Sequence, residues 1–223
     1  MQNYSGLILY DVFGTIFIAS FRYNNFTASQ GGKFMKQKTA FTTKKIVTIA
    51  LLAALTAAGS ALRIKVPTDI AGTSDFHLGN ILCALSGILL GPWAGGLAAG
   101  LGSAIYDMFD PIHISECWLT FLMKGAYGVA AGLVAHAGRK EWGYGKALAG
   151  TVTGAVTYAV LYLGKNWLKT VVVQGVAPGA ALAAVLVSKL TPTVFNAMVA
   201  IIAAPALALA IRQALKQNRI SLD

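Results

Sequence analysis

The chain has 223 residues, of which 56% are hydrophobic and 12% are charged, and its formal net charge is +10 at pH 7. This composition excludes a disordered chain, which would be rich in charge and poor in apolar residues, and soluble domains carry about twice this share of charged residues. The basic residues stand between long apolar runs, which argues against nucleic acid as a partner. Two cysteines are too few for a disulfide framework. The sequence therefore predicts a polytopic protein of the cell membrane, embedded in the lipid bilayer.

The N-terminal region contains an apolar run, residues 6–21, that is interrupted by Asp11 and has no basic leader. It therefore does not resemble a secretory signal. Residues 30–36 can be encoded by a string that contains the bacterial ribosome-binding sequence AAGGAGGT ahead of an ATG codon. We expect translation to begin at Met35. Residues 1–34 would then be a translated leader or disordered extension, and residues 35–223 the membrane domain.

Five apolar runs follow, and one of them is long enough for two helices, so that each predicted helix approaches the roughly 20 residues that a membrane span needs. They predict an all-α fold, a bundle of six transmembrane helices. Gly91-Pro92 divides one long run into two short helices joined by a tight turn, because proline interrupts a helix. The predicted spans cover residues 46–62, 76–91, 93–109, 117–136, 147–164 and 190–211.

The stretch 171–188 is also apolar and uncharged, but Pro178-Gly179 breaks it, and Lys169 and Lys189 bracket it. The sequence leaves open whether it is a loop or includes a short re-entrant helix. We do not count it as a seventh span, because that would place the basic C-terminus outside the cell.

Charge sets the orientation, since Lys and Arg are enriched in short cytoplasmic loops. With six spans, one side receives the basic residues Lys36, Lys38, Lys44, Lys45, Arg139, Lys140, Lys146, Arg212, Lys216 and Arg219. The other side receives Asp69, Asp75, Asp107, Asp110 and Glu116. We therefore expect both termini to be cytoplasmic, although Lys165 and Lys169 fall on the outer side.

Motifs of enzyme chemistry are absent. No segment matches the phosphate-binding G-x-x-x-x-G-K-[ST] pattern, a serine nucleophile elbow, H-E-x-x-H or C-x-x-C. The sequence therefore predicts neither an enzyme nor a resident cofactor, and the chain is not expected to hydrolyse ATP itself.

Small residues recur at four-residue spacing, which lets helix backbones approach closely in lipid. Packing within the bundle accounts for the glycines of this set, Gly87, Gly91, Gly95, Gly96, Gly100, Gly128, Gly132, Gly150 and Gly154. The first span carries two alanine rows, one of Ala50, Ala54 and Ala58 and a second of Ala53, Ala57 and Ala61. Either internal packing or a docking face for another membrane protein explains them.

Polar groups within the membrane are costly and usually mark a site. Lys124 lies inside its span and shares a helix face with Glu116 and Thr120. Either a ligand or an internal carboxylate partner explains Lys124. The candidate binding residues, nearly all in the outer half, are His77, Asn80, Asp107, Glu116, Trp118, Lys124, Asn166 and Asn196.

Several of these candidates have competing explanations: Asp107 is also explained as a solvated helix-end carboxylate, and His77 as a helix-end hydrogen-bond donor. Trp118 is our first choice to stack on a planar heterocycle because it lies near Glu116, although an interfacial aromatic belt also explains it. His113 and Glu116 have metal-compatible spacing, but two ligands do not make a site, so we predict no metal.

An outward-facing site with no convincing internal repeat favours a capture subunit. A self-sufficient secondary transporter or small channel is the alternative, and it would usually place its site near the midplane between repeated halves. A structural scaffold is a third interpretation.

Four segments, taken together in this order, resemble the S components of energy-coupling factor (ECF) vitamin transporters, closest to the riboflavin-type and unassigned group. They are Phe76-His77-Leu78-Gly79-Asn80, Gly91-Pro92-Trp93-Ala94-Gly95-Gly96, Gly102-Ser103-Ala104-Ile105-Tyr106-Asp107 and Phe121-Leu122-Met123-Lys124-Gly125. The similarity runs from about Lys44 to Lys216, and residues 1–34 have no counterpart in it.

The resemblance implies a membrane-embedded subunit that captures a vitamin or related micronutrient from outside, with a pocket at the outer ends of the later helices. It implies as partners a transmembrane coupling subunit and two ABC ATPases. Ala50, Ala54 and Ala58 match the A-x-x-x-A docking pattern of the family. Riboflavin, pyridoxine and other micronutrients all remain open as the substrate.

Overall fold

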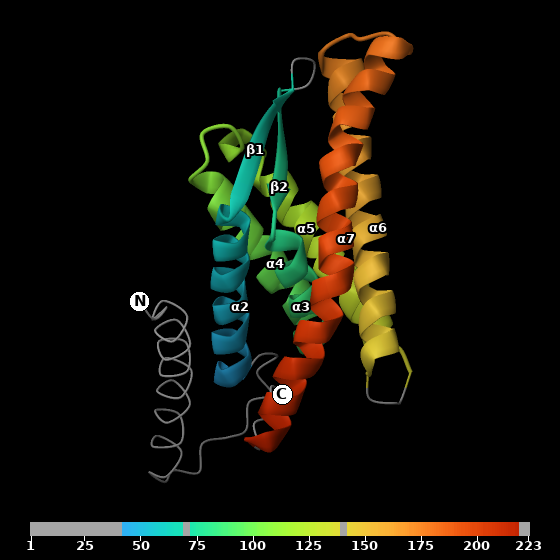
Figure 1. The fold of residues 1–223 in the computed structure, drawn as a ribbon. Coiled ribbons are helices and arrows are strands. Elements are labelled where there is room, and N and C mark those ends of the chain that lie inside the picture. The colour runs from blue at the N-terminus through green and yellow to red at the C-terminus, as the bar shows by residue number, and fades with distance from the viewer. Residues whose placement is uncertain (1–41, 69–71, 139–141, 219–223) are drawn as a thin grey trace, which may run out of the picture. The chain divides into compact units, whose positions relative to one another are not determined.

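The computed structural model describes residues 42–68, 72–138 and 142–218, so the expected leader 1–34 and the expected start at Met35 lie outside the described residues. The described part is a helical bundle with one antiparallel β-hairpin (Figure 1). Its six α-helices are α2 (Thr43–Ala61), α3 (Gly79–Leu90), α4 (Pro92–Met108), α5 (Cys117–Ala135), α6 (Tyr144–Leu168) and α7 (Ala180–Gln217). The predicted fold class, a six-helix membrane bundle, is confirmed.

The helices differ in length. Four stretches are long and apolar enough to cross a membrane: α2, α5 with the preceding 3₁₀ turn Ile114–Glu116, α6 with the following π-helical turn Lys169–Val173, and α7. The central helix α3 has 12 residues, or about 18 Å of helical rise. It contacts all five other helices, which therefore shield its short ends from lipid.

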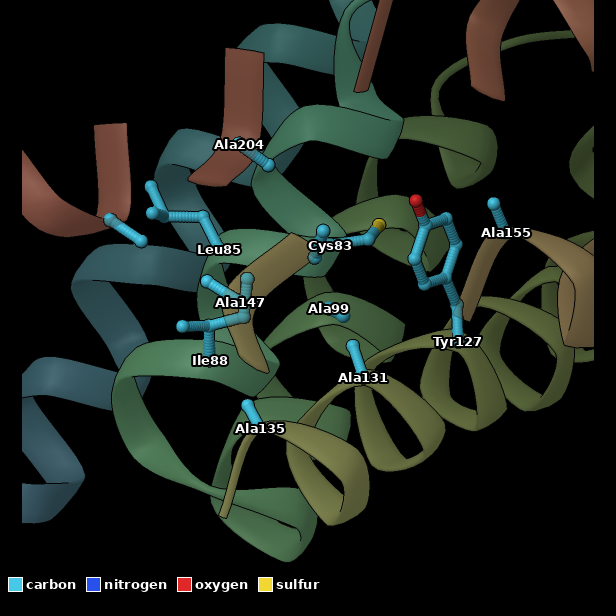
Figure 2. Packing of buried hydrophobic residues seen from close by; sticks show 12 residues of the cluster. Cys83, Leu85, Ile88, Ala99, Tyr127, Ala131, Ala135, Ala147, Ala155 and Ala204 are labelled. Carbon is cyan, nitrogen blue, oxygen red and sulfur yellow. The ribbon is translucent and has the colours of Figure 1, made fainter. Parts of the chain in front are cut away.

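Small residues bring α3, α4 and α5 into close contact. A side chain at Gly87 of α3 would collide with the backbone of Gly128 in α5, and one at Gly95 of α4 with the backbone of Ser86 in α3. The adjoining core contains Ile88 and a row of alanines; Figure 2 shows Ala131 and Ala135 of α5 directed into this cluster. Close backbone approach thus replaces large apolar side chains as the main packing device.

The β-hairpin, β1 (Arg63–Thr68) and β2 (Gly72–His77), was not predicted from the sequence. The predicted second span began at residue 76, which is wrong, because Phe76 and His77 end β2 and α3 begins at Gly79. In the hairpin, Arg63 pairs with His77 and Lys65 with Asp75. Arg63 and Lys65 alternate with apolar residues and so share one face of β1.

The C-terminal part of the chain also departs from the prediction. Pro178-Gly179 does end one segment, but α7 then runs unbroken for 38 residues, so 171–188 holds no separate re-entrant helix and the span 190–211 is part of α7. Lys189 marked a boundary in the sequence, yet it lies within α7 and lines a cavity, where a charged side chain is tolerated. The helix α6 likewise extends beyond its predicted end at residue 164, as far as Leu168, because the charged side chain of Lys165 also lines the cavity.

Candidate functional site

A cavity of about 390 Å³ lies at the end of the bundle that carries the hairpin. Its walls come from the C-terminal ends of α2, α4 and α6, the N-terminal parts of α5 and α7, and both strands of the hairpin. The size falls within the range of small-molecule sites, about 300 to 1,000 Å³. The basic residues that the structure describes outside the hairpin and the cavity wall lie at the opposite end of the bundle. Lys44, for example, is in the first turn of α2, and Lys216 is in the last turn of α7.

Most of the candidate residues come together at this cavity. The six that line it are His77, Asp107, Glu116, Lys124, Asn166 and Asn196. Asn80 is buried and accepts a hydrogen bond from the Lys124 ammonium, so it contacts the site through Lys124. Trp118 does not line the cavity, and 59% of its surface is exposed. The aromatic walls are instead Tyr158 and Tyr162.

Arg63 joins the hairpin to α4. Its Nη1 lies 2.9 Å from Oδ2 of Asp75, and its Nη2 lies 3.3 Å from Oδ1 of Asp107. The guanidinium also lies 4.5 Å from the ring centroid of Tyr106, close enough for a cation–π interaction. Sequence reasoning did not select Arg63 or Asp75 as site residues, because nothing in the local pattern indicates a strand that turns both toward α4.

The loop after α4 adds a second layer to this network. His113 lies 3.2 Å from a carboxylate oxygen of Asp75 and 3.2 Å from one of Asp110, and Lys65 lies 2.7 Å from Asp110. The hydrogen bond to Asp75 raises the pKa of His113, although burial opposes the increase. Burial alone would raise the pKa of Asp110, but the bonds from Lys65 and the Ile112 N–H lower it to about 2. Both shifts favour the charged forms and so tie the loop to the hairpin.

Glu116 connects the start of α5 to the end of α6. Its two carboxylate oxygens accept hydrogen bonds of 2.6 Å from Lys165 and of 2.6 Å from Lys169. This pairing accounts for the two lysines that contradicted the expected charge distribution, since they serve the cavity wall. Two ammonium groups on one carboxylate leave this part of the wall with an excess positive charge.

Lys124 is the most deeply buried cation of the cavity, with 3% of its surface exposed. It contacts two uncharged groups: the Asn80 amide oxygen and the Tyr158 ring, whose centroid lies 4.0 Å from Nζ. Tyr158 stacks in turn on Tyr162 at 5.5 Å between ring centroids. Within the described residues no Asp or Glu forms an ion pair with Lys124, so the internal carboxylate that the sequence left open is not found there.

Three further candidates fix the backbone or a ring near the site. The Asn196 side chain accepts from the His77 N–H at 3.0 Å and donates to the Asp75 carbonyl at 2.9 Å, which attaches β2 to α7. The Gly79 N–H donates to Nδ1 of His77, so this nitrogen carries no proton and the proton of a neutral ring lies on Nε2. Asn166 donates to the Tyr162 carbonyl one turn earlier in α6.

The site is therefore suited to bind a small polar molecule with an aromatic part. It offers ammonium, guanidinium, imidazole and hydroxyl donors together with two tyrosine rings. Among residues 42–68, 72–138 and 142–218, no group of three or more His, Cys, Asp or Glu side chains is arranged to hold a metal ion. His113 and Glu116, the weak metal pair of the sequence, are engaged with separate ionic partners.

Comparison with known proteins gives three findings. Residues 40–213 match the family described as ECF-type riboflavin transporter, S component. A relative from Pyrococcus woesei, described as an uncharacterized protein in a gap 3′ region, is 32% identical over 110 residues, which are 49% of this chain and 69% of the relative. A solved structure of the S component of a bacterial ECF transporter is 16% identical, covers 78% of this chain and 98% of its own, and has a TM-score of 0.56. The last likeness shows a shared fold.

Proposed function

We propose that this chain, which belongs to the ECF-type riboflavin transporter S component family, captures a vitamin or related micronutrient at the outer face of the cell membrane. The family is one of transporter subunits and not of enzymes. Accordingly, the chain is a multi-pass membrane protein and a substrate-binding transporter subunit.

The cavity carries the proposal. It is enclosed by side chains from the hairpin and from five of the six described helices. The helices contribute their charged residues from the same end of the bundle. A path through the bundle for a self-sufficient carrier would need polar residues on both sides of the midplane. Here the other half is packed mainly by glycine and alanine, and its buried Ser86 and Thr151 hydroxyls donate to carbonyls of the preceding turn of their own helices. This asymmetry favours capture at one surface.

The charge distribution supports an outward-facing cavity. Basic residues at the opposite helix ends, among them Lys44, Lys45, Lys146 and Arg212, would lie on the cytoplasmic side by the positive-inside rule. In this orientation both termini are cytoplasmic.

A transmembrane coupling subunit and two ABC ATPases complete the proposed transporter. The exposure of α2 supports this part: Ala50, Ala54 and Ala58 all face away from the bundle, whereas Ala53 of the neighbouring row is buried. A smooth helix face of small residues allows a partner helix to approach closely. We propose this face as the contact with the coupling subunit.

The test separates binding from transport. The purified chain in lipid nanodiscs should bind one member of a panel of vitamins and related micronutrients, which includes riboflavin and pyridoxine, in a 1:1 complex measured by native mass spectrometry. Vesicles that contain the chain alone should not accumulate that compound, and uptake should appear only when the coupling subunit, both ATPases and ATP are present. Gradient-driven uptake by the chain alone would establish the secondary-transporter alternative instead.

A further inference from the structure

The charges on the cavity wall do not balance, and this imbalance bears on the substrate. Five basic side chains line the cavity, Arg63, Lys124, Lys165, Lys169 and Lys189, against three carboxylates, Asp75, Asp107 and Glu116. All three carboxylates are near basic groups already: Asp75 and Asp107 pair with Arg63, and Glu116 pairs with two lysines. The wall thus has an excess of two positive charges when its histidines are neutral.

The excess is concentrated on one side. On the wall formed by the hairpin and α4, the single cation Arg63 faces the two carboxylates of Asp75 and Asp107, so this wall carries no positive excess. The wall formed by α5, α6 and α7 carries four lysines and the single carboxylate of Glu116. A ligand in the cavity therefore meets a positive wall on the side where the tyrosine rings also lie.

The surroundings of Lys124 indicate which kind of ligand group would bind against this wall. Its ammonium is buried, and the Asn80 amide and the Tyr158 ring stabilise the charge without neutralising it. An ammonium has three donors, and behind it the Asn80 Nδ2 is a buried donor for which no acceptor is found within the described residues. A buried charge without a countercharge is costly, and a ligand that displaced water from the cavity would raise that cost unless it brought a negative charge.

We infer that the substrate carries an oxyanion, a carboxylate or a phosphate, which binds against Lys124, with its ring system in reach of Tyr158 and Tyr162. Thr120, one turn before Lys124 on α5, and Ser103 line the same cavity and supply hydroxyl donors of the kind that oxyanions accept from. This inference rests on the proposed substrate-binding function and narrows it: an uncharged vitamin such as riboflavin itself would leave the positive wall unmatched.

The experiment identifies the ligand without a preselected list. The full chain in nanodiscs is incubated with a small-molecule extract of bacterial cells, and captured compounds are identified by mass spectrometry. The captured compound and its uncharged derivative, the amide of a carboxylate or the dephosphorylated form of a phosphate, are then titrated by calorimetry. We expect the uncharged derivative to bind about 100-fold more weakly, because breaking a buried charge pair has an effect of this order.

Three variants assign the preference to Lys124. Lys124→Met should lose the discrimination between anion and derivative, whereas Lys124→Arg, which retains the charge, should keep it. Lys146→Met is the matched control, because Lys146 is at the other end of the bundle, where it donates to the Ala137 carbonyl. If Lys124→Met does not fold, the wild-type discrimination and its retention in Lys124→Arg still decide the matter.

The outcomes are distinguishable. Capture of a compound that is uncharged at pH 7.4, or wild-type affinity of Lys124→Met for the anion, would contradict the inference that an oxyanion binds against Lys124. Either result would leave the proposed binding function intact. If the wild-type chain captures nothing from the extract, the proposed function fails, and the oxyanion with it.

Discussion

The two halves of the α4–α5 pair differ in packing: one half is in close backbone contact, and the other half lines the cavity. In one half, Gly95 and Gly128 lie so close to neighbouring backbone that no side chain fits. In the other half, Asp107 and Lys124 extend into a cavity of about 390 Å³. The glycine half gains stability from close contact, while the cavity half keeps charged groups that the membrane interior would otherwise disfavour. Rigid packing at one end thus supports a polar site at the other.

The largest effect should come from filling a contact in the packed half. Gly87→Val adds a branched side chain whose Cβ would collide with the backbone of Gly128, and overpacking typically costs about 1 to 3 kcal/mol even where neighbours can shift. Backbone atoms cannot shift readily, so we expect no monodisperse protein by size-exclusion chromatography. Gly164→Val is the control, because nothing lies within 4 Å of a side chain added there. Equal yields of the two variants would show that close contact is not the packing device.

An exposed small residue should behave differently from a buried one. Ala54 faces away from the bundle, so Ala54→Leu should leave folding and ligand affinity unchanged within about twofold, since surface substitutions usually have small effects. If this face docks the coupling subunit, ATP-dependent uptake should nevertheless be lost. Ala149→Leu, the same change at an exposed alanine of α6, is the control and should transport normally. Full uptake by Ala54→Leu would remove α2 as the docking face.

In the cavity half, the largest effect is expected at Arg63. Arg63→Met leaves Asp75 and Asp107 without their shared partner, and breaking a buried ion pair costs about 3 to 5 kcal/mol. The hairpin should detach from α4, with faster hydrogen exchange in β1 and β2 and ligand affinity lowered by tenfold or more. Lys65→Met is the matched control, because Lys65 is more exposed and pairs with Asp110 alone. Similar exchange rates in both variants would contradict a central role for Arg63.

The sequence predicted the bundle far better than the cavity wall, and these residues show why. The span α2 follows from an uninterrupted apolar run and α5 from a run with a single charge, and Gly91-Pro92 identifies the turn between α3 and α4 directly. Arg63 was missed because its role depends on a strand that turns it toward residues 44 positions away in α4. Pairings of that kind leave no local pattern.

Two lysines within apolar regions, Lys124 and Lys189, show a second limit of sequence-based prediction. Lys124 was found because a charge within an apolar run is conspicuous. Lys189 also interrupts an apolar region, yet it was interpreted as the end of a segment. Only the course of α7 shows that Lys189 faces a cavity and not solvent beyond a helix end. A charge alone does not distinguish these cases.

A smaller effect should follow from pH. His113 faces Asp75, Asp110 and the guanidinium of Arg63, and its hydrogen bond to Asp75 raises its pKa above the ordinary value of 6.5. The stabilisation is therefore complete below pH 6.5 and is lost as the pH rises through the raised pKa. Hydrogen exchange in the hairpin, corrected for the intrinsic rate, should increase severalfold between pH 6 and pH 9. His113→Gln should show no such rise; a rise of equal size would assign the effect to another group.

The smallest effect is expected at Trp118, and it tests the cavity itself. Trp118 has 59% of its surface exposed, whereas Tyr162 lines the cavity beside the stacked Tyr158. Trp118→Leu should therefore change ligand affinity by less than about twofold, because an exposed aromatic side chain outside the site contributes little to binding. Tyr162→Leu, the same class of substitution, should lower the affinity by about tenfold through the loss of ring contact. The reverse order, measured by calorimetry on both variants, would mean that the ligand binds on the outer face of α5 and not in the cavity.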